Sequence, residues 1–180
     1  MNTKRIVITG GPGTGKTSII NELIKRNHIC LEEISRQVTL EAQKKGIEQL
    51  FLTEPLLFSD MLLEGRHKQF TEALEFDTPF TFLDRGIPDV VAYMDYLGTE
   101  YPERFVEACE NHKYDYVFIL APWQEIYTSD NERYENFDQA IEIHHKLVDT
   151  YSKYGYELND VPFDSVEKRT DFILNIVESL

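Results

Sequence analysis

A stretch of small and charged residues near the amino terminus has the composition of an anion-binding loop. Gly10 and Gly15 are followed by Lys16 and Thr17, which fits the pattern G-x4-G-K-[ST] without a mismatch. Glycines allow consecutive backbone N–H groups to turn inward around an anion, and the lysine ammonium can reach the outer phosphates. The spacing therefore predicts a loop that binds the phosphates of a nucleoside triphosphate.

The residues on both sides of this loop favour the same interpretation. The apolar run 5–9 predicts a strand before the loop, and residues 16–26 place apolar side chains on one face of a helix after it. The positive N-terminal end of such a helix attracts the same anion. A glycine-rich turn that occurs by chance needs neither a strand before it nor a helix after it. The expected nucleotide-binding residues are Gly11, Pro12, Gly13, Thr14, Gly15, Lys16, Thr17 and Ser18.

Two carboxylates stand at the ends of further apolar runs. Glu33 ends the weaker run 28–33, and Asp84 ends the run 79–84. Because ligands of open α/β sheets bind beyond the carboxyl ends of the strands, we expect both carboxylates beside the phosphate loop. Asp84 and the Thr17 hydroxyl are placed to hold Mg²⁺, and Glu33 is placed to accept the proton of an attacking hydroxyl.

Arginines accompany these carboxylates. Arg36 and Arg85 can bind anionic oxygens, and Arg133 in the segment 130–138 can close over a transferring phosphoryl group. Each cluster also has a plain structural interpretation, because Glu33 with Arg36 can be a solvated pair and 130–138 can be a solvated helix face. The phosphate loop favours the functional interpretation of all of them.

Aromatic residues are numerous in the region between these clusters. Tyr93 is a candidate for contact with the second substrate, because its ring can stack on a base. Such rings are also common in protein cores, and both interpretations stay open. The other aromatic residues of this region are Phe51, Phe58, Phe70, Phe76, Phe80 and Tyr96.

The order of apolar runs predicts the fold class. Strand-like runs alternate with helix-like segments, which is typical of an α/β domain with a parallel sheet covered on both faces. No repeat or linker divides the chain, so we expect a single domain over residues 1–180. The expected strands are 5–9, 28–33, 79–84, 114–121 and 156–162, and the expected helical segments are 16–26, 36–75, 88–97, 102–112 and 131–154.

The overall composition excludes several classes of partner. A net charge of −14 argues against nucleic acids and anionic membrane surfaces, and no apolar stretch is as long as a membrane span. The amino terminus leads directly into a strand, so we expect no secretory signal and a cytoplasmic location. Cys30 and Cys109 lack metal-site spacing and are expected to be reduced thiols.

Taken together, these motifs resemble the small P-loop ATPase/kinase family that includes the ribosylnicotinamide kinase domain, itself similar to deoxynucleoside and thymidylate kinases. The resemblance extends from Arg5 to about Leu174 and rests on the segments GGPGTGKTS, EEISR, FLDRGIPDVVAY, DNER and GYELNDVPFDSVEKR. It implies a three-layer P-loop NTPase fold with a five-stranded parallel sheet in the order 2-3-1-4-5.

The resemblance also implies roles for particular residues. Glu33 and Arg36 match the family's Glu-x-x-Arg, Asp84 and Arg85 its Asp-Arg-Gly, and Arg133 with Asp130 its lid motif. By analogy, an adenine-binding loop is expected near residues 162–166. The lid segment here is acidic, which suits a neutral, nucleoside-like acceptor better than an anionic one.

Two functions remain open. The first is an ATP-dependent phosphotransferase that moves the γ-phosphoryl group, with Mg²⁺, to a small nucleoside-like or nucleotide acceptor. The alternative is a P-loop ATPase or nucleotide-dependent switch without a small-molecule acceptor. Lys16, Glu33, Asp84, Arg85 and Arg133 are the expected catalytic residues of the first, and the pattern of charged residues does not decide the oligomeric state.

Overall fold

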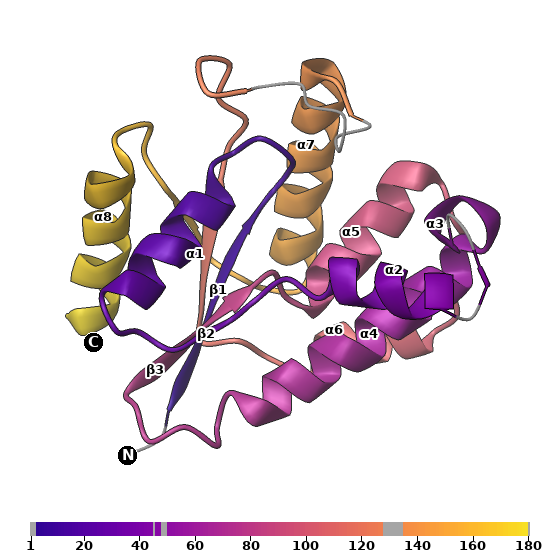
Figure 1. Ribbon diagram of the computed structural model, residues 1–180, viewed down its shortest axis with the longest axis horizontal. Coiled ribbons are helices and arrows are strands. Elements are labelled where there is room, and N and C mark those ends of the chain that lie inside the picture. Colours follow the sequence, from indigo (N-terminus) through magenta and orange to yellow (C-terminus); the bar gives the residue numbers. More distant parts are fainter. Residues whose placement is uncertain (1–2, 45, 48–49, 128–134, 180) are drawn as a thin grey trace.

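The computed structural model describes residues 3–44, 46–47, 50–127 and 135–179. Within these residues, five strands form one parallel sheet in the order β2–β3–β1–β4–β5 (Figure 1). The predicted α/β fold class and strand order are therefore confirmed. The strands are β1 (Lys4–Gly10), β2 (Cys30–Leu31), β3 (Phe80–Asp84), β4 (Tyr116–Leu120) and β5 (Leu158–Asp160).

Helices cover both faces of the sheet and create three layers. In Figure 1, α1 and α8 lie together on one side of the strands, and α5 and α7 lie on the other. Three helices, α2 to α4, occupy the connection between β2 and β3. The described helices are α1 (Lys16–Lys25), α2 (Ser35–Lys44), α3 (Leu50–Thr53), α4 (Pro55–Glu72), α5 (Ile87–Leu97), α6 (Arg104–Asn111), α7 (Phe137–Lys153) and α8 (Val166–Glu178).

The central strand β1 supplies both hydrophobic cores. Successive side chains of a strand point to opposite faces, so Ile6 and Ile8 pack under α1 and α8 while Val7 packs under α5 and α7. All three side chains are fully buried. The sequence of a central parallel strand is therefore a continuous apolar run, and this is the pattern that predicts a strand over residues 5–9.

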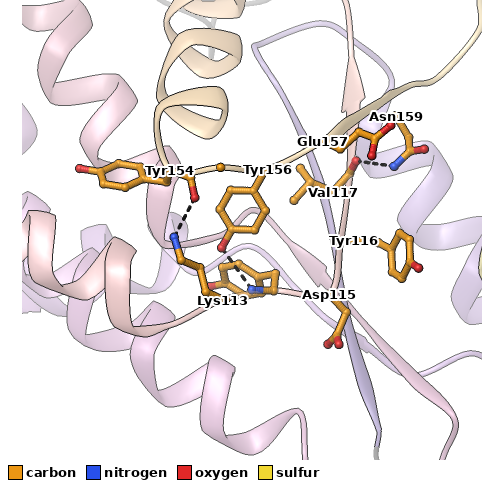
Figure 2. Close-up of a pocket in the computed structure, with 10 residues that line it drawn as sticks. Lys113, Asp115, Tyr116, Val117, Tyr154, Tyr156, Glu157 and Asn159 are labelled. Carbon is orange, nitrogen blue, oxygen red and sulfur yellow. Dashed lines mark hydrogen bonds between the residues drawn. The ribbon is translucent and has the colours of Figure 1, made fainter.

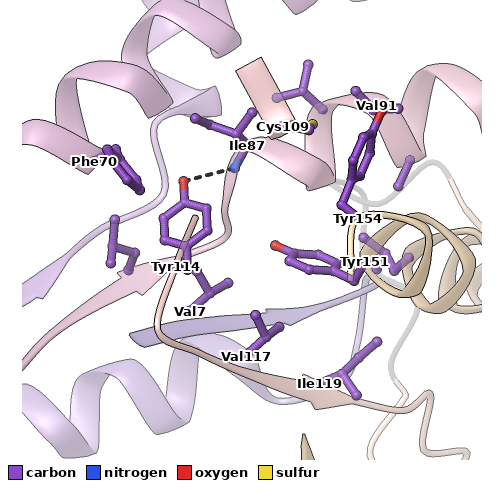
Figure 3. Close-up of a cluster of buried hydrophobic side chains, with 14 of the residues drawn as sticks. Val7, Phe70, Ile87, Val91, Cys109, Tyr114, Val117, Ile119, Tyr151 and Tyr154 are labelled. Carbon is purple, nitrogen blue, oxygen red and sulfur yellow. Dashed lines mark hydrogen bonds between the residues drawn. The ribbon is translucent and has the colours of Figure 1, made fainter. Parts of the chain in front are cut away.

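The core under α5 and α7 contains two tyrosines, Tyr114 and Tyr151, whose hydroxyls are hydrogen-bonded. Figure 3 shows the Tyr114 hydroxyl beside the backbone of Ile87, which donates its N–H at 3.0 Å. The Tyr151 hydroxyl donates to the Asp89 carboxylate at 2.6 Å. Because buried polar groups are costly without partners, these bonds fix the turn between β3 and α5 as well as the core.

Several element boundaries differ from the sequence-based predictions. The described residues of the helix-like segment 36–75 belong mainly to three helices, and Pro55, which cannot continue a helix, begins the third, α4. The helix expected over 131–154 begins at Phe137 in the described chain, where the Asn136 side chain accepts from the N–H of Gln139. Helix α8 was not predicted, although Ser165 accepts from the N–H of Lys168 at its start.

No helix among the described residues combines the length and the apolar character that crossing a bilayer would require.

Candidate active site

The predicted phosphate loop connects the end of β1 to the start of α1. Gly13 and Gly15 have φ angles of 70° and 83°, a left-handed conformation that glycine adopts without strain. Gly15 precedes α1, and no side chain caps the helix there. The first N–H groups of α1 are therefore available to an anion, together with the positive end of the helix dipole.

Lys16 lies between this loop and the end of β3. Its ammonium donates to the Oδ1 atom of Asp84, and the two residues are only 8% and 4% exposed. Burial lowers the pKa of Lys16, the nearby Arg85 lowers it further, and Asp84 and Glu33 oppose the shift. Lys16, which is expected to bind the nucleotide, and Asp84, which is expected to bind the metal ion, therefore lie at the same edge of the sheet and are paired with each other.

Glu33 is held by two arginines at the same edge. Arg66 Nη2 donates to Glu33 Oε1 at 2.5 Å, and Arg85 Nε lies 2.6 Å from Glu33 Oε2. Burial by itself would raise the pKa of Glu33, but Arg66, Arg85 and Lys16 outweigh it and lower the pKa to about 2. Glu33 is therefore ionised throughout the physiological pH range, and each of its two carboxylate oxygens is paired with an arginine.

The turn after β3 is held in an unusual backbone conformation. Arg85 has a φ of 75°, which is uncommon for a residue other than glycine. The Asp89 carboxylate accepts from the N–H of Gly86 at 2.8 Å and from the Thr9 hydroxyl at 2.5 Å, and Arg85 Nη1 lies 3.3 Å from it. These interactions fix the side chain of Arg85 beside Glu33. The backbone strain at Arg85 therefore lies within the candidate site.

Comparison with known proteins identifies the family. The family described as AAA domain matches residues 5–169, which is most of the chain. The chain belongs to the AAA domain family. A curated relative, the guanylate kinase of Clostridium tetani (strain Massachusetts / E88), is 28% identical over 177 residues, covering 91% of this chain and 81% of the relative.

Solved structures share the fold of this AAA domain. Deoxyadenosine kinase from M. mycoides with bound products has a TM-score of 0.72 at 16% identity and covers 98% of this chain and 100% of that chain. The NadR protein in complex with NR has a TM-score of 0.75 at 15% identity over 98% of this chain and 50% of that chain. Thymidylate kinase from Candida albicans has a TM-score of 0.68 at 17% identity over 99% and 92%.

These comparisons confirm the predicted family and the predicted P-loop kinase-like fold. They also confirm the expected class of enzyme, an ATP-dependent, kinase-like one. The relatives act on different small molecules by name, so the comparisons leave the acceptor of this AAA domain to be argued from its own residues.

The structure gathers four of the predicted catalytic residues in one cluster and shows the exposure of others. Lys16, Glu33, Asp84 and Arg85 form one cluster at the carboxyl edge, and the Tyr93 ring centroid lies 5.2 Å from Arg85 Cζ. Thr17 and Ser18 are exposed at the start of α1, and Arg36 is exposed at the start of α2. Arg133 and Asp130 lie outside the described residues.

Two residues of this cluster were missed by the sequence analysis. Arg66 of α4 is 3% exposed, binds Glu33 and donates to the Asp84 carbonyl oxygen at 2.6 Å. Asp89 is 2% exposed and fixes the turn that carries Arg85. Asp89 belongs to the quoted segment after β3, whereas Arg66 stands in a long helical segment with no local motif, so only its burial reveals it.

The donors at this edge fit a magnesium ion. Thr17 and Asp84 offer oxygen ligands, and Mg²⁺ commonly takes only one or two protein ligands and keeps several waters. Across the described ranges, no three His, Cys, Asp or Glu side chains are arranged to hold a metal ion. To bind the ion, the Asp84 carboxylate would have to release the Lys16 ammonium, which would then be free to contact the phosphates.

A hollow at the opposite edge of the sheet is separate from this site. It measures about 590 Å³ and is lined by residues that precede and begin β4 and β5. Figure 2 shows Lys113 and Tyr156 there, with the Lys113 ammonium donating to the Tyr154 carbonyl at 2.8 Å. Ligands of open parallel sheets bind at the carboxyl ends of the strands, so size alone does not make this hollow the active site.

Proposed function

We propose that this AAA domain, acting as one domain over residues 1–180, transfers the γ-phosphoryl group of ATP to a hydroxyl of a small, uncharged, nucleoside-like acceptor. The observation that carries the proposal is the Glu33 carboxylate, held by Arg66 and Arg85 at the same edge of the sheet as the Lys16–Asp84 pair. A phosphate loop alone serves hydrolysis and transfer equally. A carboxylate fixed beside this loop is suited to orienting an acceptor hydroxyl for attack on the γ-phosphorus.

Each group has a part in this reaction. The loop N–H groups and Lys16 bind the triphosphate and balance the charge that develops on the transferring group. The acceptor oxygen forms a bond to the γ-phosphorus while the bond to the bridging oxygen of ADP breaks. Because a carboxylate with a pKa of about 2 is a weak base, the hydroxyl proton passes to Glu33 late, once the new bond has made the attacking oxygen strongly acidic. Mg²⁺, held by Thr17 and Asp84, would supply further charge neutralisation at the phosphates.

The charge balance of the cluster supports an uncharged acceptor. Lys16, Arg66 and Arg85 are matched by Asp84, Glu33 and Asp89 through close ion pairs. Glu33 engages both Arg66 and Arg85, so neither has a full charge left for the phosphate of a monophosphate acceptor. The names of the relatives include a deoxyadenosine kinase and a guanylate kinase, which stand for the uncharged and the anionic acceptor class.

The test is a screen for ATP-dependent phosphorylation of nucleosides, pyridine ribosides and the matching 5′-monophosphates. ADP release without an acceptor is the baseline, and product mass identifies the phosphorylated compound. We expect release above baseline with an uncharged nucleoside or riboside. Equal release with and without every acceptor would favour the ATPase or switch alternative, and faster turnover with monophosphates would overturn the uncharged acceptor.

A further inference from the structure

Arg169 of α8 is a buried cation for which the described residues provide no carboxylate partner. It is 2% exposed, and burial lowers the pKa of its guanidinium. Its Nε and Nη2 atoms are buried and have no hydrogen-bond partner within the described part of the chain. Because buried charges are unfavourable without a counter-charge, this arginine requires a functional explanation.

The guanidinium packs directly on the outer side of the phosphate loop. Arg169 Nη1 donates to the Thr14 carbonyl oxygen at 3.0 Å. A Cβ atom on Gly15 would lie only 2.8 Å from the same nitrogen. Gly15 therefore has two reasons to be glycine, its left-handed backbone and the close approach of Arg169.

This hydrogen bond has a directional consequence for the loop. In a trans peptide the carbonyl and the following N–H point in opposite directions. With the Thr14 carbonyl turned out to Arg169, the N–H of Gly15 is turned away from Arg169, as an inward-facing anion-binding loop requires. A cation on the carbonyl also polarises the peptide and strengthens its N–H as a donor.

Among the described residues near Arg169 are aromatic and apolar side chains. Its Cζ atom lies 5.7 Å from the centroid of the Trp123 ring, which stacks on Phe163 at 5.2 Å. Ile126 Cδ1 would lie 3.2 Å from a Cβ on Gly15, at the same place on the loop. Such neighbours screen a charge weakly, so the field of Arg169 acts on the loop more strongly than that of a solvated cation.

We propose that Arg169 is a positioning residue for the donor nucleotide. It acts through the Thr14–Gly15 peptide rather than by touching the phosphates, and its positive charge is balanced when the triphosphate binds. The inference rests on the proposed binding of ATP by this loop. It adds a residue from α8, far from the loop in sequence, to the groups that set nucleotide affinity.

The test replaces Arg169 by methionine and measures MgATP affinity by calorimetry together with the thermal midpoint of the unliganded protein. We expect the Kd for MgATP to rise about tenfold or more, as for the loss of a charged hydrogen bond. The unliganded midpoint should stay or rise, because an apolar side chain of similar length replaces an unpaired buried cation. The KM for ATP should rise while kcat at saturating ATP and the KM for the acceptor stay nearly unchanged.

Lys25→Met is the matched control, since Lys25 is a cation on the neighbouring α1 with a 76% exposed side chain. This variant should bind MgATP like the wild type. If Arg169→Met does not fold, Arg169→Lys and Arg169→Gln decide, with affinity expected to fall from wild type to lysine to glutamine. Wild-type affinity in the methionine or glutamine variant, including a case where only the thermal midpoint drops, would overturn the role of Arg169. Absence of MgATP binding by the wild type would instead overturn the proposed function, and this inference with it.

Discussion

Two buried arginines lie on opposite sides of the candidate site, and their surroundings differ. Arg66 is 3% exposed and binds the Glu33 carboxylate, the Asp84 carbonyl oxygen and the Gln69 side chain. Arg169 is 2% exposed and has a single hydrogen bond, to the Thr14 carbonyl oxygen, among the described residues. The charge of Arg66 is balanced within the fold, whereas that of Arg169 is left for a ligand. Under the proposed function, the edge assigned to the acceptor is therefore complete in itself, and the side assigned to the nucleotide is completed by binding.

Lys16 links the two sides, and its removal should have the largest effect. Lys16→Ala takes away the ammonium that neutralises the transferring phosphoryl group and leaves Asp84 buried without its cation. We expect phosphoryl transfer to fall by about 10³ or more, because one preorganised donor at a reacting centre alone contributes about 10²–10³. Initial rates with the best acceptor measure this loss, and Lys25→Ala serves as the surface control. Wild-type turnover in Lys16→Ala would remove the catalytic role of the loop.

Arg66→Met provides the sharpest contrast with Arg169→Met. Breaking a buried ion pair by removing one partner typically costs about 3–5 kcal/mol, and Glu33 would keep only Arg85. We expect the free energy of unfolding to fall by an amount of that order in urea titrations, with no such loss in Arg169→Met.

Arg104→Met is the control for this comparison. Arg104 forms a bidentate pair with Asp60 on the surface, and its side chain is 48% exposed. Exposed pairs contribute about 0–1 kcal/mol, so this variant should remain close to the wild type. Equal stabilities of the Arg66 and Arg104 variants would contradict the contrast between a locally balanced and a ligand-balanced arginine.

The parts of the site that the sequence predicted are those whose signal is local. Lys16 stands beside the glycines that it works with, and Asp84 ends an apolar strand, so spacing alone located both. The sheet order followed from the family resemblance, and the structure confirms it. Strong apolar runs, such as that of β1, identified the central strands for the same reason.

The parts that were missed depend on contacts between distant segments. Arg66 reaches Glu33 across 33 positions, and Arg169 reaches Thr14 across 155. In sequence Arg66 looks like an ordinary charged residue of a helical segment, and Arg169 is the last residue of the segment GYELNDVPFDSVEKR. Only the packing of α4 and α8 buries the two side chains. The loss of exposure is a tertiary property, so no pattern within either segment could have revealed it.

Acid unfolding should reveal the pairing of Glu33. Its pKa is lowered to about 2 in the folded protein from 4.5 in the unfolded chain, so its stabilising contribution is present above pH 4.5 and is lost as the pH falls toward 2. A shift of this size corresponds to about 3.5 kcal/mol at most, since each pKa unit is about 1.4 kcal/mol. Urea titrations between pH 5 and 3 should show a steeper loss of stability in the wild type than in Glu33→Gln. Parallel curves would show that the arginines do not hold Glu33 ionised.

Glu33→Gln should have a smaller effect on the rate than the loss of Lys16, and it separates transfer from hydrolysis. Glutamine keeps the size and hydrogen-bonding capacity of the side chain but cannot take a proton or balance Arg66 and Arg85. General-base removal typically costs about 10²–10⁴ in rate, and the loose transition state of phosphoryl transfer places the loss near 10². Affinity for MgATP should hardly change, because the proposed function assigns Glu33 to the acceptor hydroxyl rather than to the phosphates.

The measurement compares kcat with the best acceptor and the Kd for MgATP in Glu33→Gln and in Glu32→Gln, below the unfolding temperature of both. Glu32 is the exposed neighbour, so its variant should match the wild type in both quantities. A turnover loss confined to Glu33→Gln and to acceptor-dependent ADP release would tie this carboxylate to transfer. An equal fall in acceptor-independent ATP hydrolysis would assign Glu33 to a water instead, and unchanged turnover would leave it as a partner that only fixes the two arginines. A large loss of MgATP affinity would move Glu33 to the nucleotide side and break the division between the two edges.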